Sequence, residues 1–324
     1  MDYRKLGRNG IKVSEFSLGA WVTYGGQVGE DVALECMKAA YDCGVNFFDN
    51  ADVYAMGQAE TVMGNVIKKL GLKRKDLVIS SKVFWPTGEG PNDRGLSRKH
   101  IMESVHTSLK RLDTDYLDLY YCHRYDPEVP LEEVVRAMDD LVHQGKILYW
   151  GTSEWRAWQI SDATALARQW GLYPPVVEQP HYNMFQRDIV ETELADTANE
   201  HGIGLVVWSP LASGVLTGKY NDGIPEGSRM ADPDYTWLQA LITEDRITQV
   251  RQLTEVARDL GATVAQLALV WLLRNPEVSS VITGASRADQ VRENMKALEL
   301  KEKLTPDVLA RIEEILGNDP NAEA

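Results

Sequence analysis

The sequence predicts an α/β protein, a (β/α)8 TIM barrel with an N-terminal β-hairpin and a C-terminal tail helix. Apolar strand patterns alternate with amphipathic helix patterns about eight times. The strands are apolar almost throughout, which is typical of a parallel sheet buried on both faces. Eight units without a change of rhythm favour a closed barrel over a doubly wound sheet. We expect residues 1–324 to form one barrel domain.

The hairpin is expected first, with strands over 3–6 and 11–16 flanking a turn that ends in Asn9-Gly10. Glycines directly after several helix patterns mark helix ends. A long connection, 210–243, contains Gly, Pro and Ser and one short apolar piece. The barrel strands are expected around 17–20, 45–49, 77–83, 116–123, 147–152, 176–179, 204–209 and 279–283. The helices are expected over 30–43, 59–70, 97–112, 131–144, 158–170, 188–201, 244–260, 263–274 and 287–298, with the tail helix over 306–316.

Composition narrows the functional class. The formal net charge is -14, and such a surface repels nucleic acid and anionic membranes. No apolar run approaches the length of a membrane span, and the N-terminus has no signal-peptide pattern. The 3 cysteines, Cys36, Cys43 and Cys122, form no Cys-x-x-Cys pair and indicate reduced thiols. We therefore expect a cytoplasmic protein that does not insert into membranes or bind nucleic acid.

Polar and aromatic residues gather where the predicted strands end. In a (β/α)8 barrel the chemistry lies at the C-terminal ends of the strands. Read in order, those ends carry Trp21, Asp49 with Tyr54, Lys82 with Trp85, His123, Ser153, Gln179, Trp208-Ser209-Pro210 and Gly284-Ala285-Ser286.

Four of these side chains form a candidate catalytic set: Asp49, Tyr54, Lys82 and His123. A free tyrosine has a pKa of about 10, and a nearby ammonium is expected to lower it. The carboxylate would hold the ammonium, and His123 could orient a substrate oxygen or share the proton. Such a cluster suits a carbonyl that becomes an alkoxide, as in hydride transfer. Each residue alone also has an ordinary structural interpretation, but their joint placement on consecutive strand ends favours catalysis.

No Gly-x-Gly-x-x-Gly motif is present, so a Rossmann module is not expected. The last strand-to-helix junction, 284–290, can instead bind phosphate at a helix N-terminus. Ser286 and Arg287 supply the extra donors that a 2′-phosphate needs. The alternative is an ordinary capped helix with a surface arginine. No pair of histidines, cysteines and acids has metal-ligand spacing, so no metal site is expected.

The motifs resemble those of the aldo-keto reductases. The resemblance is carried by Gly44 to Tyr54, Ser81-Lys82, Leu117 to His123, Trp150 to Ser153, Trp208 to Leu211 and Gly284 to Asn294, and it covers nearly the whole chain. Within the family, the resemblance is greatest to the β subunits of voltage-gated potassium channels and their microbial relatives, through Ala20 to Gln27, Arg94 to Ile101, Asn183 to Arg187 and Trp208 to Tyr220.

The resemblance implies NADPH-dependent reduction of a small carbonyl substrate, with Tyr54 as general acid, Lys82 and Asp49 tuning it, and His123 orienting the carbonyl. Trp21, Trp85 and Trp155 would wall the substrate pocket. It also implies a cofactor site made of Trp21, Ser153, Gln179, Trp208, Ser209, Pro210, Leu211, Ser213, Lys219, Arg229, Gly284, Ser286, Arg287, Gln290, Glu293 and Asn294.

The chain departs from the family pattern at two positions that matter. Glu154 stands where asparagine or arginine is common, and a carboxylate cannot donate a hydrogen bond to a carboxamide. His123 stands where the channel subunits have asparagine, so the chain is closer to the ordinary reductases there. A slow-turnover, redox-sensing NADP(H)-binding subunit remains the alternative function. The resemblance also suggests a homo-oligomer, a tetramer.

Overall fold

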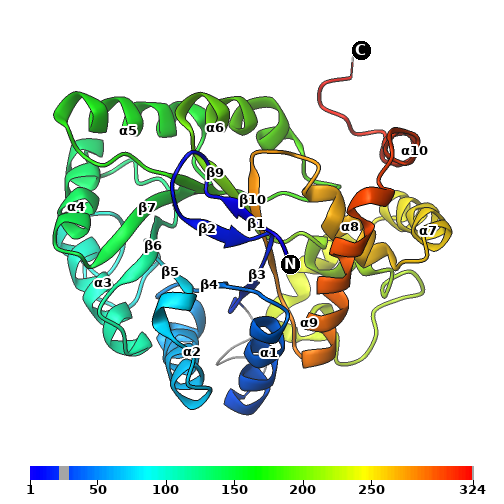
Figure 1. Cartoon of the computed structure of the whole chain (residues 1–324), viewed down its shortest axis with the longest axis horizontal. Coiled ribbons are helices and arrows are strands. Elements are labelled where there is room, and N and C mark those ends of the chain that lie inside the picture. The colour runs from blue at the N-terminus through cyan, green and yellow to red at the C-terminus, as the bar shows by residue number, and fades with distance from the viewer. Residues whose placement is uncertain (22–28, 323–324) are drawn as a thin grey trace.

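The computed structural model describes residues 1–21 and 29–322, and its centre is a closed barrel of parallel strands (Figure 1). The order around the barrel is β10-β3-β4-β5-β6-β7-β8-β9, so chain neighbours pair and the last strand closes on the first. The predicted (β/α)8 barrel is confirmed. Its strands are β3 (Phe16–Gly19), β4 (Phe47–Asp49), β5 (Val78–Val83), β6 (Leu117–Cys122), β7 (Ile147–Ser153), β8 (Val177–Gln179), β9 (Gly204–Val207) and β10 (Val278–Thr283).

The predicted hairpin, β1 (Tyr3–Lys5) and β2 (Lys12–Ser14), is antiparallel and lies across the N-terminal end of the barrel (Figure 1). Its turn requires a glycine at Gly7, which has φ +56°. A Cβ there would stand 2.2 Å from the Gly202 carbonyl oxygen. Since it lies across the N-terminal end, the hairpin covers the end of the barrel opposite the predicted site.

Helices surround the barrel and cover the outer faces of its strands (Figure 1). Ser97 caps α3 by accepting a hydrogen bond from the His100 backbone N–H. The helices are α1 (Glu30–Asp42), α2 (Gln58–Lys69), α3 (Arg98–Leu112), α4 (Leu131–His143), α5 (Ala157–Trp170), α6 (Ala195–His201), α7 (Glu244–Asp259), α8 (Val264–Leu272), α9 (Ala288–Met295) and the predicted tail helix α10 (Pro306–Leu316).

The long connection 210–243 contains three 3-10 helices: η4 (Ala212–Thr217), η5 (Arg229–Ala231) and η6 (Pro233–Leu241). The start of η6 has a physical signal. The Asp232 side chain accepts from the Asp234 backbone N–H, and Pro233 supplies the first residue. The other 3-10 helices are η1 (Tyr54–Gly57), η2 (Arg74–Asp76) and η7 (Lys296–Lys303) in the described ranges, and a π-helical turn, η3 (Val190–Leu194), precedes α6.

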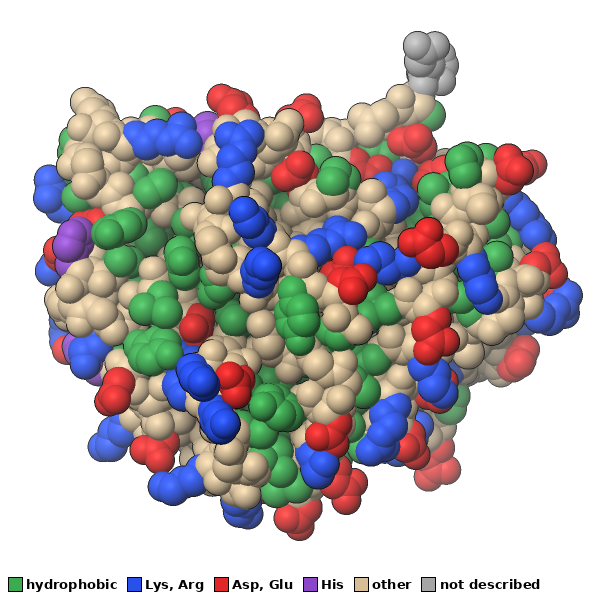
Figure 2. All heavy atoms as spheres, viewed as in Figure 1, with side chains coloured by type: hydrophobic (Ala, Val, Ile, Leu, Met, Phe, Trp, Pro, Cys, Tyr) green, Lys and Arg blue, Asp and Glu red, His purple; other side chains and the backbone are tan. Residues whose placement is uncertain are grey.

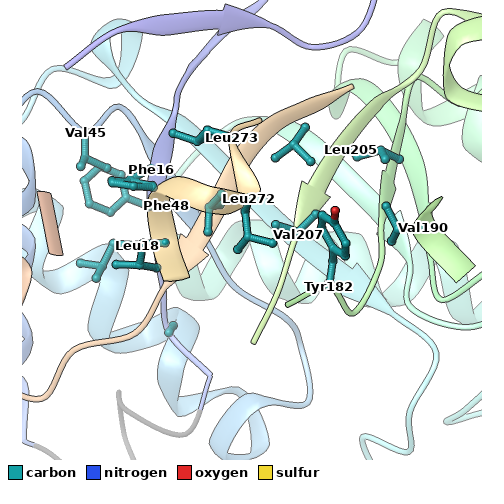
Figure 3. Packing of buried hydrophobic residues seen from close by; sticks show 14 of the residues in the cluster. Phe16, Leu18, Val45, Phe48, Tyr182, Val190, Leu205, Val207, Leu272 and Leu273 are labelled. Atoms are coloured by element: carbon teal, nitrogen blue, oxygen red, sulfur yellow. The ribbon is translucent and has the colours of Figure 1, made fainter. Parts of the chain in front are cut away.

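Two apolar layers explain why the strands are apolar almost throughout. Phe47 belongs to a cluster inside the barrel, whereas its neighbour Phe48 packs in the larger layer between strands and helices. In Figure 3, Phe16, Leu18 and Phe48 of the barrel strands point toward this outer layer, together with Leu272 of α8. Both faces of the sheet are thus buried.

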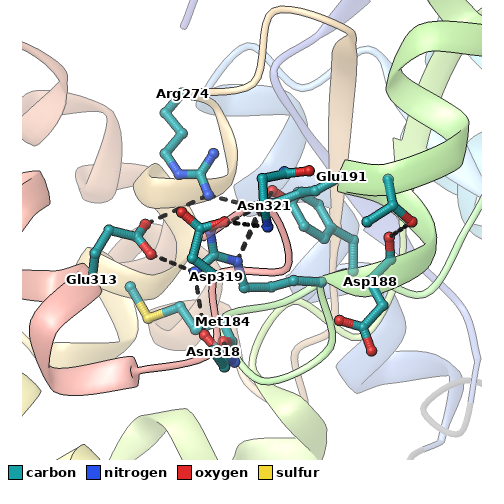
Figure 4. A network of polar contacts seen from close by, with 11 residues as sticks. Met184, Asp188, Glu191, Arg274, Glu313, Asn318, Asp319 and Asn321 are labelled. Atoms are coloured by element: carbon teal, nitrogen blue, oxygen red, sulfur yellow. Dashed lines mark hydrogen bonds and ion pairs between the residues drawn. The ribbon is translucent and has the colours of Figure 1, made fainter. Parts of the chain in front are cut away.

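The tail is fastened to the barrel by a network of ion pairs (Figure 4). The buried Arg187 guanidinium pairs with Glu191 at 2.8 Å and with Glu313 of α10 at 2.5 Å. Arg274 adds a second cation at 2.8 Å from Glu191. Elsewhere, acidic and basic side chains are spread over the face shown in Figure 2, with hydrophobic side chains between them. Within the described ranges, no helix is long and apolar enough to cross a membrane.

Candidate active site

The side-chain period of the strands brings the predicted catalytic residues together. Successive strand residues point to opposite faces, so every second residue points into the barrel. The interior cluster contains Phe47, Val78, Tyr121 and Val177. Counting onward in steps of two from these residues toward each strand's C-terminal end gives the polar residues Asp49, Lys82, His123 and Gln179. Each of them is buried at the same end of the barrel.

Lys82 is the hub of this group. Its Nζ atom donates to Asp49 Oδ2 at 2.6 Å, to the Asn50 carbonyl oxygen at 2.8 Å and to Tyr54 Oη at 3.2 Å. An ammonium has three protons and no acceptor, so all three are used. Tyr54 Oη therefore accepts from Lys82, and its own proton is left to donate elsewhere. Because Tyr54 lines a cavity, that proton is available to a bound molecule.

Asp49 is held in place by further donors. Its Oδ1 atom accepts from Ser80 Oγ at 2.8 Å and from Gln179 Nε2 at 3.0 Å. The Ser153 hydroxyl donates in turn to the Gln179 carbonyl oxygen at 2.9 Å. A carboxylate with this many hydrogen-bond partners is fixed in orientation.

The expectation that Lys82 lowers the pKa of Tyr54 was wrong for the protein without ligand. Burial raises the pKa of Tyr54 well above its usual value, and the Asp49 charge raises it further. The ammonium does not offset this, because Asp49 neutralises it at 2.6 Å. Burial likewise lowers the pKa of Lys82, opposed by Asp49. Tyr54 therefore carries its proton at neutral pH, as a general acid must.

His123 is a neutral imidazole. Burial lowers its pKa well below the usual value, and the charges of Lys82 and Arg124 lower it further. Its ring centroid lies 5.9 Å from that of Tyr54, and both rings line the cavity. A neutral imidazole can direct a hydrogen bond at a substrate oxygen but is a poor proton source. The two groups therefore differ in chemistry: Tyr54 has a proton that it can donate, whereas His123 can direct a hydrogen bond.

The cavity has a volume of about 1010 Å³ and lies at the C-terminal end of the barrel. Tyr54, Asp49 and His123 line one end. Every residue of the predicted cofactor site lines it as well: Trp21, Ser153, Gln179, Trp208, Ser209, Pro210, Leu211, Ser213, Lys219, Arg229, Gly284, Ser286, Arg287, Gln290, Glu293 and Asn294. Residues so far apart in sequence thus share one wall.

Contacts with three residues fix the orientation of the Trp208 indole. Its Nε1–H donates to Glu154 Oε1 at 2.9 Å, and the same oxygen accepts from the His181 backbone N–H at 2.6 Å. The His181 ring stacks on the indole at 4.3 Å between centroids, and Trp21 meets it edge-on at 5.7 Å. Glu154 therefore positions an aromatic ring in the cavity wall. Sequence reasoning did not foresee this role for Glu154, nor the part played by His181.

The predicted substrate wall is only partly reproduced. Trp21 and Trp85 line the cavity. Trp155 does not, because it is only 1% exposed and packs edge-on against Tyr125 at 4.9 Å. Arg124 lines the cavity and was missed, although it directly follows His123 at a strand end. Residues 22–27 of the channel-like stretch lie outside the described residues.

The cavity contains cations without acidic partners. In the described ranges, no carboxylate lies within salt-bridge distance of Arg124, Lys219, Arg229 or Arg287. Two acids that line the same cavity pair with other cations: Asp289 with Arg292, and Glu293 with Lys296. The N-terminus of α9 also has no side-chain cap. Free N–H groups and unpaired cations fit a phosphate-bearing ligand such as a dinucleotide. Across residues 1–21 and 29–322, no cluster of His, Cys, Asp and Glu could hold a metal ion.

Comparison with known proteins agrees with this geometry. A sequence model of the Aldo/keto reductase family matches residues 15–317. A "Probable voltage-gated potassium channel subunit beta" of Arabidopsis thaliana is 53% identical over 322 residues, covering 99% of this chain and 98% of the relative. The protein of the same description in Oryza sativa is 51% identical, with the same coverage. A "Putative voltage-gated potassium channel subunit beta" of Schizosaccharomyces pombe is 50% identical, covering 99% of this chain and 94% of the relative.

Proposed function

The chain belongs to the aldo/keto reductase family, and from that premise we propose that it reduces aldehydes and ketones to alcohols with NADPH as its cofactor. Membership of the family supports an oxidoreductase. The observation that carries the finer proposal is the hydrogen bond from Lys82 to Tyr54 Oη at 3.2 Å, which leaves the Tyr54 proton free to be donated. When bound, NADPH would supply the hydride.

The residues of the chain have separate tasks in this mechanism. The substrate carbonyl oxygen accepts from Tyr54 Oη–H, and the neutral His123 fixes its direction. As negative charge develops on that oxygen, Tyr54 transfers its proton to it. The resulting phenolate lies beside the Lys82 ammonium, which Asp49 holds at 2.6 Å. The transition state is stabilised by groups that are already in place, so little reorganisation is needed.

The proposed cofactor position follows the cavity wall. The nicotinamide would face Trp208, with Ser153 and Gln179 near its carboxamide. Ser209, Leu211, Ser213, Lys219 and Arg229 would bind along the pyrophosphate and ribose. Ser286, Arg287 and Gln290 at the start of α9 would receive the 2′-phosphate, so the proposal includes a preference for NADPH over NADH. Equal affinities for the two cofactors would contradict that preference.

The test is a Tyr54→Phe variant, which keeps the ring and removes the proton. With NADPH absorbance as readout and an aromatic aldehyde as substrate, we expect kcat to fall by about 10²- to 10⁴-fold. NADPH affinity, measured by calorimetry, should be unchanged, because the cofactor residues are intact. Undiminished reduction by the variant would refute Tyr54 as the acid.

A second candidate function comes from the similarity to proteins described as β subunits of voltage-gated potassium channels. We propose, as the alternative, a subunit that binds NADP(H) tightly and turns over slowly within a larger assembly. The segment that includes η4 and η5 lines the cavity and could retain the cofactor. Rapid cofactor exchange, together with no stable partner in a pull-down, would count against it. The tetrameric, cytoplasmic protein that the resemblance suggests is tested by light scattering and fractionation.

A further inference from the structure

We propose that Arg124 selects carbonyl substrates that carry a carboxylate group. This rests on the proposed carbonyl reduction and adds a substrate class to it.

The first argument is the position of Arg124. It directly follows His123 at the end of β6 and lines the cavity beside Tyr54. Its guanidinium carbon lies 5.5 Å from the centroid of the Trp85 ring, and Nη1 donates to the His123 carbonyl oxygen. The Trp85 and His123 rings are themselves 6.4 Å apart. Arg124 is therefore at the reacting end of the cavity, away from α9.

The second argument is that the charge of Arg124 is not compensated by the protein. In the described part of the chain, no carboxylate lies within salt-bridge distance of it, and residues 22–28 contain no acid. The nearby Asp126 accepts instead from the Leu96 and Glu128 backbone N–H groups. A guanidinium has five N–H donors, and among the described residues Arg124 makes a single contact to an acceptor. Its charge also reaches the site, because it lowers the pKa of Tyr54 against the effect of burial.

The third argument is the match between this group and a ligand. A planar guanidinium binds a carboxylate through two parallel hydrogen bonds. The Trp85 face beside it suits an aromatic or short apolar spacer, and Tyr54 and His123 take the carbonyl oxygen. The predicted class is therefore aldehydes and ketones with a carboxylate a few atoms from the carbonyl. A neutral carbonyl compound bound in the cavity would leave the Arg124 charge without an anionic partner.

The chemical step is the same as for a neutral substrate. The carbonyl carbon gains a hydride as NADPH is oxidised to NADP⁺, and the carbonyl oxygen gains the Tyr54 proton. The carboxylate takes no part in bond making or breaking. Its contribution is to binding and orientation.

The test compares 4-carboxybenzaldehyde with its methyl ester, which has the same shape around the aldehyde but no charge. The variants are Arg124→Gln, which removes the charge, and Arg124→Lys, which keeps the charge but not the fork. Arg258→Gln on α7 is the matched control, because Arg258 is exposed and its ion pair is with Glu255 on the same helix. The readouts are kcat/KM for both aldehydes, and calorimetric binding of 4-(hydroxymethyl)benzoate to the NADP⁺ complex.

We expect the protein to prefer the acid over the ester by about tenfold or more, and Arg124→Gln to abolish that preference by acting on the acid alone. Arg124→Lys should restore part of it. The inference is overturned if Arg124→Gln lowers both substrates equally, or if the acid is not preferred. If NADPH binds but neither aldehyde is reduced, the proposed function fails and this inference with it. If the ester is reduced normally and the acid is not preferred, only the inference fails.

Discussion

The two ends of the cavity treat charge in opposite ways. At the catalytic end, Lys82 and Asp49 pair at 2.6 Å and are both almost fully buried. Along the rest of the cavity, Lys219, Arg229 and Arg287 have no acidic partner in the described ranges. A compensated pair is complete in the protein alone, whereas an unpaired cation is completed by an anionic ligand. Under the proposed function, the compensated pair serves the chemistry and the unpaired cations serve ligand binding.

The two ends also differ in how they are built. Asp49, Lys82 and His123 lie on or directly after strands, whose geometry is fixed by the barrel. The cofactor wall depends on loops with left-handed backbone at non-glycine residues, among them Ser209 with φ 55° and Ser213 with φ 55°. Such residues cost of order 1 kcal/mol or more each and are common at ligand sites. Rigid strands suit a proton relay, and shaped loops suit a long ligand.

Breaking the compensated pair should give the largest effect. Lys82→Met removes the donor to Tyr54 Oη and leaves Asp49 buried without a cation. We expect kcat for carbonyl reduction to fall by about 10²- to 10⁴-fold and stability to fall by roughly 3 to 5 kcal/mol. The measurements are NADPH oxidation and urea unfolding.

A double variant separates these two losses. Lys82→Met with Asp49→Asn has no unpaired charge, so it should regain stability but no activity. Recovery of activity in the double variant would show that the ammonium is not needed for proton donation.

The catalytic end could be predicted from sequence because its geometry depends on a short-range rule. A strand alternates its faces, and parallel strands end at one edge of a barrel. Placing Asp49, Lys82 and His123 at strand ends was therefore enough to bring them together. The structure added the direction of each hydrogen bond, and with it the pKa of Tyr54. That shift depends on burial and on the charge of Asp49, and neither can be read from a local pattern.

The parts that could not be predicted depend on contacts between loops. Trp155 follows a strand end as Trp85 does, yet its ring turns to Tyr125 and away from the cavity. Glu154 has φ 58°, and this left-handed turn accompanies its bonds to Trp208 and His181. A sequence pattern indicates that residues share an end of the barrel, but it does not give the direction of a side chain after the strand has ended.

A buried acid in the barrel wall extends the comparison between paired and unpaired groups. The carboxyl group of Glu178 is fully buried, with no cation in salt-bridge range in the described part of the chain. It accepts from Thr152 Oγ1 at 2.5 Å and from the Trp155 backbone N–H at 3.3 Å. Burial raises the pKa of Glu178 to about 8, from 4.5. The folded protein therefore keeps a proton that the unfolded chain releases, and stability falls as pH rises from 4.5 to about 8.

Glu178→Gln cannot lose that proton, so it should flatten this part of the stability profile. The free energy of unfolding of the protein and of the variant is measured in urea at pH 5 and at pH 8.5. The difference between the two proteins should change by up to roughly 4 kcal/mol between these pH values. Asp52, whose pKa burial raises to about 7, keeps some slope in the variant. The exposed Glu255→Gln is the control. An unchanged slope in Glu178→Gln would mean that Glu178 is ionised in the folded protein.

Substitution of Arg229 should give the smallest of these effects. Its effect on stability without ligand should be opposite to that of Lys82→Met. Arg229 is partly buried in the cavity wall, and burial lowers its pKa, opposed by Tyr220 and Tyr235. Without a bound ligand, the partly buried Arg229 charge lowers the stability of the folded protein. Arg229→Gln should therefore leave the melting temperature unchanged or raise it. With NADPH present the sign should reverse, because a charge-assisted hydrogen bond to phosphate is lost. We expect the NADPH dissociation constant to rise about tenfold while kcat is kept.

The measurement is thermal unfolding with and without cofactor, together with calorimetric titration of NADPH at low and high salt. The affinity of Arg229→Gln should also depend less on salt, because one cation no longer takes part. Arg258→Gln on α7 should change none of these quantities. If Arg229→Gln instead destabilises the protein without ligand and binds NADPH normally, then Arg229 is part of the scaffold. The unpaired cations of the cavity would then not be binding groups as a class, and the contrast between its two ends would not hold.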